Sequence, residues 1–132
     1  MQEQHHQIGA VAEAVGLSLR TIRYYEEIGL VTPSGRTDGG FRLYTDADID
    51  RLRLVRALKP IGMSLETTGA LLTRADALEA AIASNGDVEA SATAFEEVLA
   101  VARRSCDEWE HRLDEARQVL SGFDRLTAGR SQ

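Results

Sequence analysis

The sequence predicts a mostly α-helical protein in which a winged helix-turn-helix head precedes one long helix that pairs with a second chain as a coiled coil. Two short amphipathic segments lie close together near the N-terminus, a glycine-rich stretch follows them, and residues 88–123 carry an apolar seam at steps of 4 and 3. The chain has 132 residues, 43% hydrophobic and 27% charged, which is typical of a soluble globular protein.

The composition excludes several classes of protein. No apolar run approaches the roughly 20 residues of a membrane helix, and the segment MQEQHHQI has no basic region followed by an apolar one. We therefore expect a cytoplasmic protein with no membrane partner. The single cysteine, Cys106, permits no internal disulfide and no cage of several cysteines around a metal. No catalytic motif has usable spacing, so we expect no enzyme activity, no metal and no cofactor.

The excess negative charge lies in the second half of the chain. The net charge is −6, yet residues 1–75 carry 9 basic and 9 acidic side chains, whereas residues 76–132 carry 6 basic and 12 acidic ones. An anionic partner is therefore expected to meet the first half.

The helix-turn-helix is predicted over residues 8–29. The first helix has an apolar stripe that ends before Gly16, although Gln7 stands where a better N-cap is expected. Ser18 is a suitable N-cap for the second helix, which Gly29 closes. The stripe of the first helix consists of Ile8, Val11, Ala12 and Val15.

The second helix has two distinct faces. A repeat at i, i+3, i+4 and i+7 places basic and aromatic side chains together on the outward face, which is the pattern of a recognition helix. The adjacent tyrosines lie about 100° apart, so Tyr25 is assigned inward and Tyr24 outward. The expected inward residues are Leu19, Ile22 and Tyr25, and the outward ones are Arg20, Arg23, Tyr24 and Glu27.

A β-hairpin, or wing, is predicted over residues 31–45, which contain a proline, three glycines and an aromatic alternation. In its returning strand Arg42 and Tyr44 share one face, and Phe41 and Leu43 share the other. One face can pack while the other contacts a partner. Packing of Tyr44 to close the hairpin is the alternative to a contact through it.

Capping residues divide the chain after the wing. Thr45 and Asp48 form an S/T-x-x-D/E arrangement that opens a helix, which Pro60 and Gly62 end. Ser64 caps the next helix, and Asp76 with Glu79 is expected to open another short one. The inward stripe of the first of these helices is Ile49, Leu52, Val55 and Leu58, and the apolar contacts of the second are Leu65, Leu71 and Leu72.

Asn85-Gly86-Asp87 is a break plus an N-cap, and the seam of the long helix continues after it for five heptads. A helix over residues 88–123 is about 54 Å long, whereas a head of about 80 residues is only about 30 Å across. Much of the seam would face water unless another chain covers it, so we expect a homodimer. The expected dimer interface consists of Phe95, Leu99, Ala102, Cys106, Trp109, Leu113, Ala116, Leu120 and Phe123.

These segments together resemble the MerR (mercury-resistance regulator) family of bacterial transcription regulators. The resemblance rests on IGAVAEAVGLSLRTIRYYEEIGLV, on P-x-x-R ending in GGFRLYT, and on DADIDRLRLVRALKPIGMSLE, in that order. It covers residues 8–74 and implies an antiparallel coiled coil whose heads each place the second helix in a major groove. It further implies a double-stranded promoter that the dimer kinks and untwists for RNA polymerase, mainly by indirect readout.

The resemblance also assigns DNA contacts to individual residues. In the recognition helix, Arg20, Arg23 and Tyr24 match contact positions, and Ser18 and Thr21 accompany them. In the wing, Arg42 and Tyr44 match phosphate contacts, with Arg36 in the turn. The domains expected are residues 1–75 (winged-helix DNA-binding domain), 76–86 (connecting helix or linker), 87–126 (coiled-coil helix) and 127–132 (flexible tail).

The effector is undetermined. Metal-sensing members place a cysteine at the start of the dimerisation helix, where this chain has NGDVEA, and redox members carry four clustered cysteines. Drug-sensing members append a large ligand domain, and only nine residues follow Phe123 here. Cys106 is expected to act as a small hydrophobe in the seam. His5 and His6 are expected in a disordered terminus, not in a metal site.

Two other functions are compatible with the sequence. An acidic coiled-coil adaptor would bind protein through its head, and a constitutive architectural factor would bind DNA without sensing an effector. A regulator should bind promoter DNA with an affinity that falls steeply as salt is added, because binding releases counterions, whereas the adaptor should not bind DNA at all. Arg20 and Arg23 would then be surface residues paired with Glu26 or Glu27.

Overall fold

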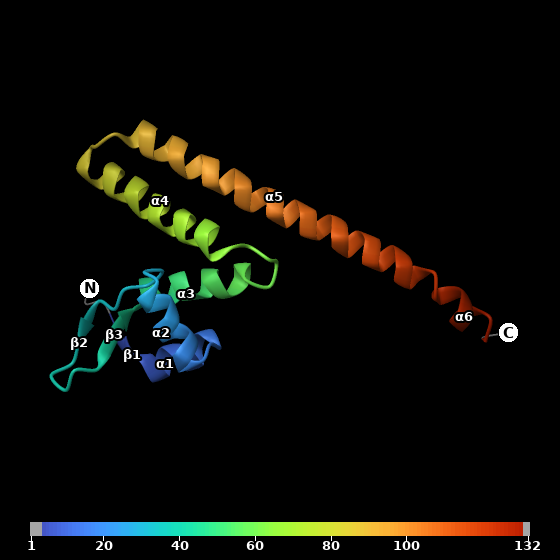
Figure 1. The fold of residues 1–132 in the computed structure, drawn as a ribbon, viewed down its shortest axis with the longest axis horizontal. Coiled ribbons are helices and arrows are strands. Elements are labelled where there is room, and N and C mark those ends of the chain that lie inside the picture. Colours follow the sequence, from blue (N-terminus) through green and yellow to red (C-terminus); the bar gives the residue numbers. More distant parts are fainter. Residues whose placement is uncertain (1–3, 131–132) are drawn as a thin grey trace.

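A computed structural model describes residues 4–130 and has a small head and a helical hairpin, the second helix of which extends well beyond the first (Figure 1). The head consists of β1 (His5–Gln7), α1 (Ile8–Val15), α2 (Leu19–Glu27), β2 (Gly35–Arg36), β3 (Arg42–Thr45) and α3 (Asp46–Leu58). The rest consists of α4 (Leu65–Ser84), α5 (Val88–Ser121) and α6 (Asp124–Ala128). The predicted fold class is confirmed: a mostly helical chain with a winged helix-turn-helix head and a long C-terminal helix.

The caps predicted for the helix-turn-helix are confirmed. Gly16 ends α1 in the left-handed region, with φ at 71°. The Ser18 side chain accepts a hydrogen bond from the backbone N–H of Thr21 at 3.1 Å and so caps α2. Gln7 precedes α1 without a side-chain capping bond, as expected. The inward assignment of Leu19 is wrong, because 41% of its surface is exposed, whereas Ile22 and Tyr25 are buried.

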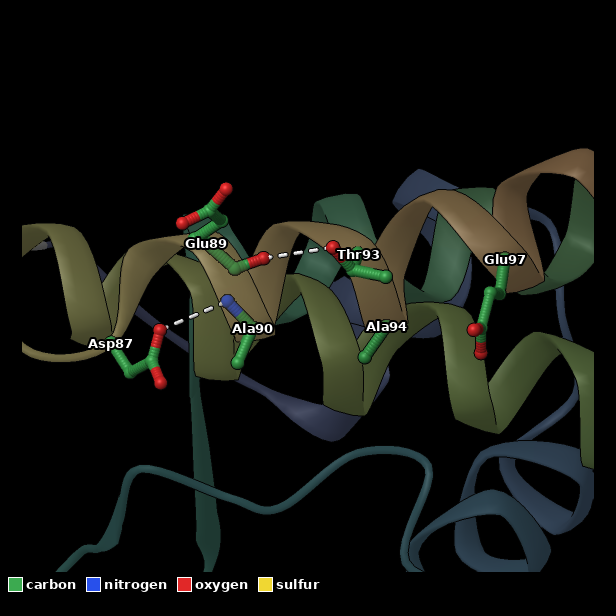
Figure 2. Close-up of a pocket in the computed structure, with 6 residues that line it drawn as sticks. All are labelled: Asp87, Glu89, Ala90, Thr93, Ala94 and Glu97. Atoms are coloured by element: carbon green, nitrogen blue, oxygen red, sulfur yellow. Dashed lines mark hydrogen bonds between the residues drawn. The ribbon is translucent and has the colours of Figure 1, made fainter.

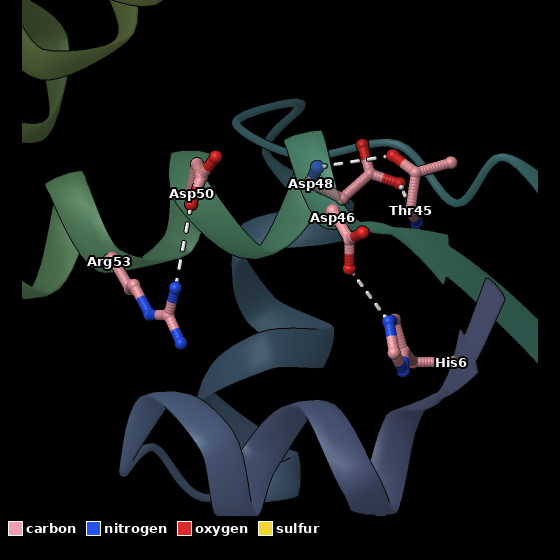
Figure 3. Close-up of polar contacts among 6 residues, drawn as sticks. All are labelled: His6, Thr45, Asp46, Asp48, Asp50 and Arg53. Carbon is pink, nitrogen blue, oxygen red and sulfur yellow. Dashed lines mark hydrogen bonds and ion pairs between the residues drawn. The ribbon is translucent and has the colours of Figure 1, made fainter. Parts of the chain in front are cut away.

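The sheet has the order β1-β3-β2, and both pairings are antiparallel. The expectation of a disordered terminus at His5 and His6 is wrong, because β1 pairs with β3 in the register His5 to Thr45. Backbone pairing with the wing orders this segment. The His6 Nε2 atom also lies 2.8 Å from Oδ1 of Asp46 at the start of α3 (Figure 3).

A reciprocal cap joins the wing to α3 (Figure 3). The Thr45 hydroxyl accepts from the Asp48 N–H at 3.2 Å, and the Asp48 carboxylate accepts from the Thr45 N–H at 2.8 Å. This capping box, predicted above, satisfies two backbone donors that a helix start leaves unpaired. Ser34 donates to the same carboxylate at 2.8 Å and ties the loop before β2 to the junction.

The head has one apolar core to which all its helices contribute. Ile49, Leu52 and Val55 face it from α3 as predicted, while Leu58 is only half-buried. Burying such side chains is worth about 1.5–3 kcal/mol each, which holds the small domain together. The buried residues of this cluster are Val11, Val15, Ile22, Tyr25, Leu30, Val31, Tyr44, Ile49, Leu52, Val55 and Leu72.

A single helix, α4, replaces the two that the sequence predicted after Ser64. No new helix opens at Asp76, because α4 runs unbroken from Leu65 to Ser84. Asp76 instead accepts from Arg51 of α3 at 2.8 Å, and Arg51 also donates to the Leu30 carbonyl at 3.3 Å. The expected domain boundary after residue 75 therefore falls inside a helix that packs on the head.

The first half of α5 packs against α4 of the same chain, and Figure 1 shows the two helices running antiparallel. Asn85 turns the chain with φ at 54°, and Asp87 caps α5. Phe95, Leu99 and Ala102 pack in a second cluster with Met63, Leu71 and Val98. Within the chain α4 buries Ala102 and part of Phe95 and Leu99, and the place of these three residues in a dimer interface stays a prediction.

Beyond Trp109, α5 extends away from the head (Figure 1), and among residues 4–130 only the short α6 packs against it there. The predicted continuous helix over residues 87–126 is wrong at its end, because α5 stops at Ser121 and a short α6 follows Gly122. Thr127 and Ala128 belong to α6, and residues 131 and 132 of the expected tail lie outside the described residues. No helix among residues 4–130 combines the length and the apolar character needed to cross a membrane.

Candidate nucleic-acid interface

The outward face of α2 carries two arginines that pair with no acid. Arg20 and Arg23 are exposed, and neither has an ion-pair partner among residues 4–130. Together with Tyr24 and Glu27 they line one shallow hollow on this face. The alternative in which Glu26 or Glu27 pairs with these arginines is not observed. Unpaired guanidinium groups on a helix that can enter a groove suit a polyanionic partner.

Local sequence explains why this face points outward. The Ser18 cap begins α2 three residues before Thr21, and the buried Ile22 and Tyr25 anchor the opposite side. Tyr24 follows with 47% of its surface exposed, and its ring lies 6.0 Å from that of Tyr25, centre to centre. The Ser18 and Thr21 hydroxyls bond to each other at 2.8 Å at the N-terminal end of the helix.

The wing presents a second basic group. Its turn closes through the Thr37 N–H, which donates to the Phe41 carbonyl at 2.8 Å. Arg36 is exposed and donates from Nη1 to the Gly40 carbonyl at 3.2 Å. Phe41 is also exposed, so the strand face that it shares with Leu43 does not bury the phenyl ring. The wing thus offers arginines and an aromatic ring to a partner.

Tyr44 does not belong to the contact surface. Its side chain has no exposed surface, and its hydroxyl donates to Glu26 Oε2 at 2.9 Å. The contact between Tyr44 and phosphate that the resemblance implied is therefore corrected in favour of the alternative, packing that closes the hairpin. Burial, together with the Glu26 carboxylate, raises the pKa of Tyr44 and keeps its hydroxyl protonated.

Glu26 joins the two parts of this surface. Its Oε1 accepts from Arg42 Nε at 2.8 Å, while its Oε2 accepts from Tyr44. The hydrogen bond to Glu26 raises the pKa of Arg42, which stays charged. Sequence reasoning missed this role of Glu26. The only signal was a carboxylate on the half-buried side of α2, and nothing in the local pattern indicated that the wing would reach it.

The start of α5 holds no metal site among the described residues. Figure 2 shows the carboxylates of Asp87, Glu89 and Glu97 standing apart along the helix. Asp87 caps the helix by accepting from the Ala90 N–H at 3.0 Å. Within residues 4–130, no group of three or more histidine, cysteine or acidic side chains converges to hold an ion.

Cys106 lies at the edge of an apolar groove of about 330 Å³ formed by α3, α4 and α5. In the single chain the Cys106 thiol is exposed. The seam residues beyond it are exposed as well, with Trp109 at 38%, Leu113 at 49% and Leu120 at 64%. Its expected behaviour as a buried hydrophobe therefore depends on a second chain that covers this part of α5.

Comparison with known proteins places the chain among regulators. Residues 7–74 match the family described as MerR HTH family regulatory protein. The HTH-type transcriptional activator mta of Bacillus subtilis (strain 168) is 32% identical over 121 residues, which are 92% of this chain and 44% of that protein. The HTH-type transcriptional regulator ZntR of Escherichia coli (strain K12) is 41% identical over 68 residues, 52% of this chain and 48% of that protein. The chain thus spans less than half the length of these curated relatives.

Two solved structures share the arrangement of head and long helix. HiNmlR, a MerR family regulator lacking the sensor domain and bound to promoter DNA, matches with a TM-score of 0.64 and 26% identity over 95% of this chain and 94% of that one. MtaN, the N-terminus of the Bacillus subtilis multidrug transporter activator, matches with a TM-score of 0.50 and 33% identity over 84% of this chain and 96% of that one.

Proposed function

Because the chain belongs to the MerR HTH family of regulatory proteins, we propose that it is a transcriptional regulator that binds a pseudo-palindromic promoter as a homodimer and acts by distorting the DNA. Such a regulator would act in the cytoplasm, with double-stranded DNA as its ligand and RNA polymerase as its partner at the promoter. Its effector is not assigned.

The observation that carries the proposal is the outward face of α2. Arg20 and Arg23 stand exposed and unpaired among the described residues, on a helix whose opposite side is anchored in the core. The chain has a net charge of −6, so two unpaired arginines side by side make this face distinct from the acidic second half. The proposed DNA surface consists of these two arginines together with Ser18, Thr21, Tyr24, Arg36 and Arg42.

The exposed half of α5 supports the homodimer. Apolar side chains continue along α5 after α4 has ended its coverage, up to Leu120 at 64% exposure, and Phe123, 58% exposed, follows directly after the helix. Contiguous apolar surface of this kind marks an interface more often than a monomer's exterior. We propose that the interface consists of the seam from Cys106 to Phe123 in antiparallel pairing, with Phe95, Leu99 and Ala102 mainly packed within each chain.

Salt-dependent DNA binding tests the proposal. The purified chain would select a site from a random-sequence pool, and binding to a fluorescent duplex carrying that site would be followed by anisotropy at several salt concentrations. We expect the logarithm of affinity to fall linearly with the logarithm of salt, by nearly one unit for each phosphate contacted. No selected site and no DNA binding would instead indicate the adaptor.

DNA distortion needs a separate measurement. A duplex labelled at both ends should show higher energy transfer between its dyes in the complex than when free, because bending brings the ends together. An unchanged transfer efficiency at saturating protein would contradict action by distortion while leaving DNA binding intact. Expression of a reporter from the same site would distinguish a regulator from an architectural factor.

A further inference from the structure

We propose that Glu26 is a positioning residue for DNA binding, which holds Arg42 of the wing by one edge so that the other edge of the guanidinium is free for a phosphate. The inference rests on the proposed function, because it concerns how the same surface is assembled. It adds a residue that would not be expected to help, since a carboxylate beside DNA normally repels it.

The geometry of the ion pair leaves most of the Arg42 donors available. Glu26 Oε1 takes only Nε of Arg42, at 2.8 Å, and the two Nη groups have no hydrogen-bond partner among residues 4–130. A guanidinium has five N–H donors in a rigid fork, so fixing one edge fixes the direction of the others. The Arg42 side chain is 33% exposed and so remains accessible to a ligand.

Glu26 is itself held in place. Its second oxygen, Oε2, accepts from the buried Tyr44 hydroxyl at 2.9 Å, and only 18% of the Glu26 side chain is exposed. A carboxylate fixed at both oxygens cannot swing away, so it determines the Arg42 rotamer. It also connects α2 with β3, the two elements that carry the proposed contacts, and thereby sets the wing relative to the recognition helix.

The opposite possibility is that Glu26 competes with phosphate for Arg42. A competing acid would occupy the terminal Nη groups, which approach a phosphate most easily, whereas Glu26 occupies Nε. The pair also neutralises the carboxylate before DNA arrives, which limits repulsion. These two roles predict opposite signs for the coupling between Glu26 and Arg42 in DNA binding.

A double-mutant cycle measures that coupling. Affinity and salt slope would be determined for the parent, Glu26→Ala, Arg42→Ala and the double variant on the selected duplex described above. We expect Arg42→Ala to lower affinity about tenfold and the salt slope by about one unit in the parent. In the Glu26→Ala background the same change should lower affinity less than about threefold, because an unheld Arg42 contributes little.

Glu27→Ala is the matched control. It removes the same charge from the next position of α2, where Glu27 is exposed and makes no ion pair within the described residues. Arg42→Ala should keep its full tenfold effect in this background. An equal effect of Arg42→Ala with and without Glu26 would overturn the proposal, and a larger effect without Glu26 would establish competition instead.

A loss of DNA binding in Glu26→Ala could also come from an unfolded head, so the folding of this variant has to be measured. Circular dichroism and urea unfolding would show whether Glu26→Ala retains a folded head. Should it unfold, Glu26→Gln keeps the size and replaces the charge-assisted bond with a weaker one, so a coupling of the same sign but smaller size is expected. A parent that selects no DNA site would overturn the proposed function and this inference together, whereas normal DNA binding without coupling overturns the inference alone.

Discussion

The indole of Trp109 on α5 lies against Gly62 in the turn between α3 and α4. A Cβ atom placed on Gly62 would stand 3.4 Å from Trp109 Nε1, and Gly62 has φ at +77°. Trp109 is the only tryptophan of the chain, and the Arg112 guanidinium lies 5.5 Å from its ring centre. The long helix therefore touches the head beyond the region that α4 covers.

Gly62 can be compared with Gly29, which has a similar φ of +82° but where an added Cβ atom would meet no atom of the described residues within 4 Å. Replacement of either glycine by alanine should cost about 1–2 kcal/mol in the free energy of unfolding, because the left-handed region disfavours a Cβ. Urea unfolding measures both. Only Gly62→Ala should alter the Trp109 fluorescence, and equal spectra for the two variants would argue against the contact.

Removal of Arg23 should weaken DNA binding without unfolding the head. Arg23→Ala takes away an exposed guanidinium with no ion-pair partner among residues 4–130, so the free energy of unfolding should change by less than about 0.5 kcal/mol. The salt slope of binding should fall by about one unit if the contact is to phosphate. Arg125→Ala, on α6, removes the same charge far from the head, and a similar loss for both variants would place the DNA surface elsewhere.

The two buried tyrosines of the head should respond differently to loss of the hydroxyl. The Tyr25 hydroxyl is buried without a hydrogen-bond partner among the described residues, whereas that of Tyr44 donates to Glu26. Tyr25→Phe should leave stability within about 0.5 kcal/mol or increase it, because an unsatisfied polar group is removed. Tyr44→Phe should cost about 1–2 kcal/mol. Urea unfolding of the two variants checks the difference, and the reverse order would contradict the assigned hydrogen bonds.

Leu113 tests the seam of α5. Leu113→Asp would place an unpaired charge in the proposed interface, where burial costs several kcal/mol, so the dimer should dissociate and DNA affinity should fall with it. Gln118→Asp adds the same charge at an exposed position outside the seam and should leave the dimer intact. Sedimentation velocity measures both, and a fully dimeric Leu113→Asp protein would disprove the register.

Cys106 should change its reactivity with the oligomeric state. Its thiol is exposed in the single chain, and the proposed partner helix would cover it. We expect a thiol reagent to modify the parent dimer slowly and Leu113→Asp quickly. Cys106→Ala should fold, dimerise and bind DNA like the parent, with a loss of at most about 1–2 kcal/mol. A stoichiometric effect of zinc, copper(I) or peroxide on DNA affinity, absent from Cys106→Ala, would instead make this residue a sensor.

Local patterns were sufficient for most of the secondary structure. Apolar spacing identified α1, α2, α3 and α5. The four capping residues could also be predicted, because a cap bonds to a backbone N–H only three residues further along the chain; they are Ser18, Thr45, Ser64 and Asp87. The exposed arginines of α2 followed from the same periodicity. These features depend on neighbours in the chain, so they can be read without knowledge of the fold.

Contacts between distant segments were decided by the tertiary structure alone. His5 is ordered because β3, some forty residues later, supplies its pairing partner. Asp76 lies inside α4, where it accepts a hydrogen bond from Arg51 of α3. Arg42 and Tyr44 share one face of β3 as predicted, and both bond to Glu26 of α2. Tyr44 is nevertheless buried, whereas the Arg42 side chain is partly exposed. Such contacts depend on which faces of the helices and strands meet when the chain packs. The apolar periodicity of one helix or strand shows which face is buried but does not show which other element covers it.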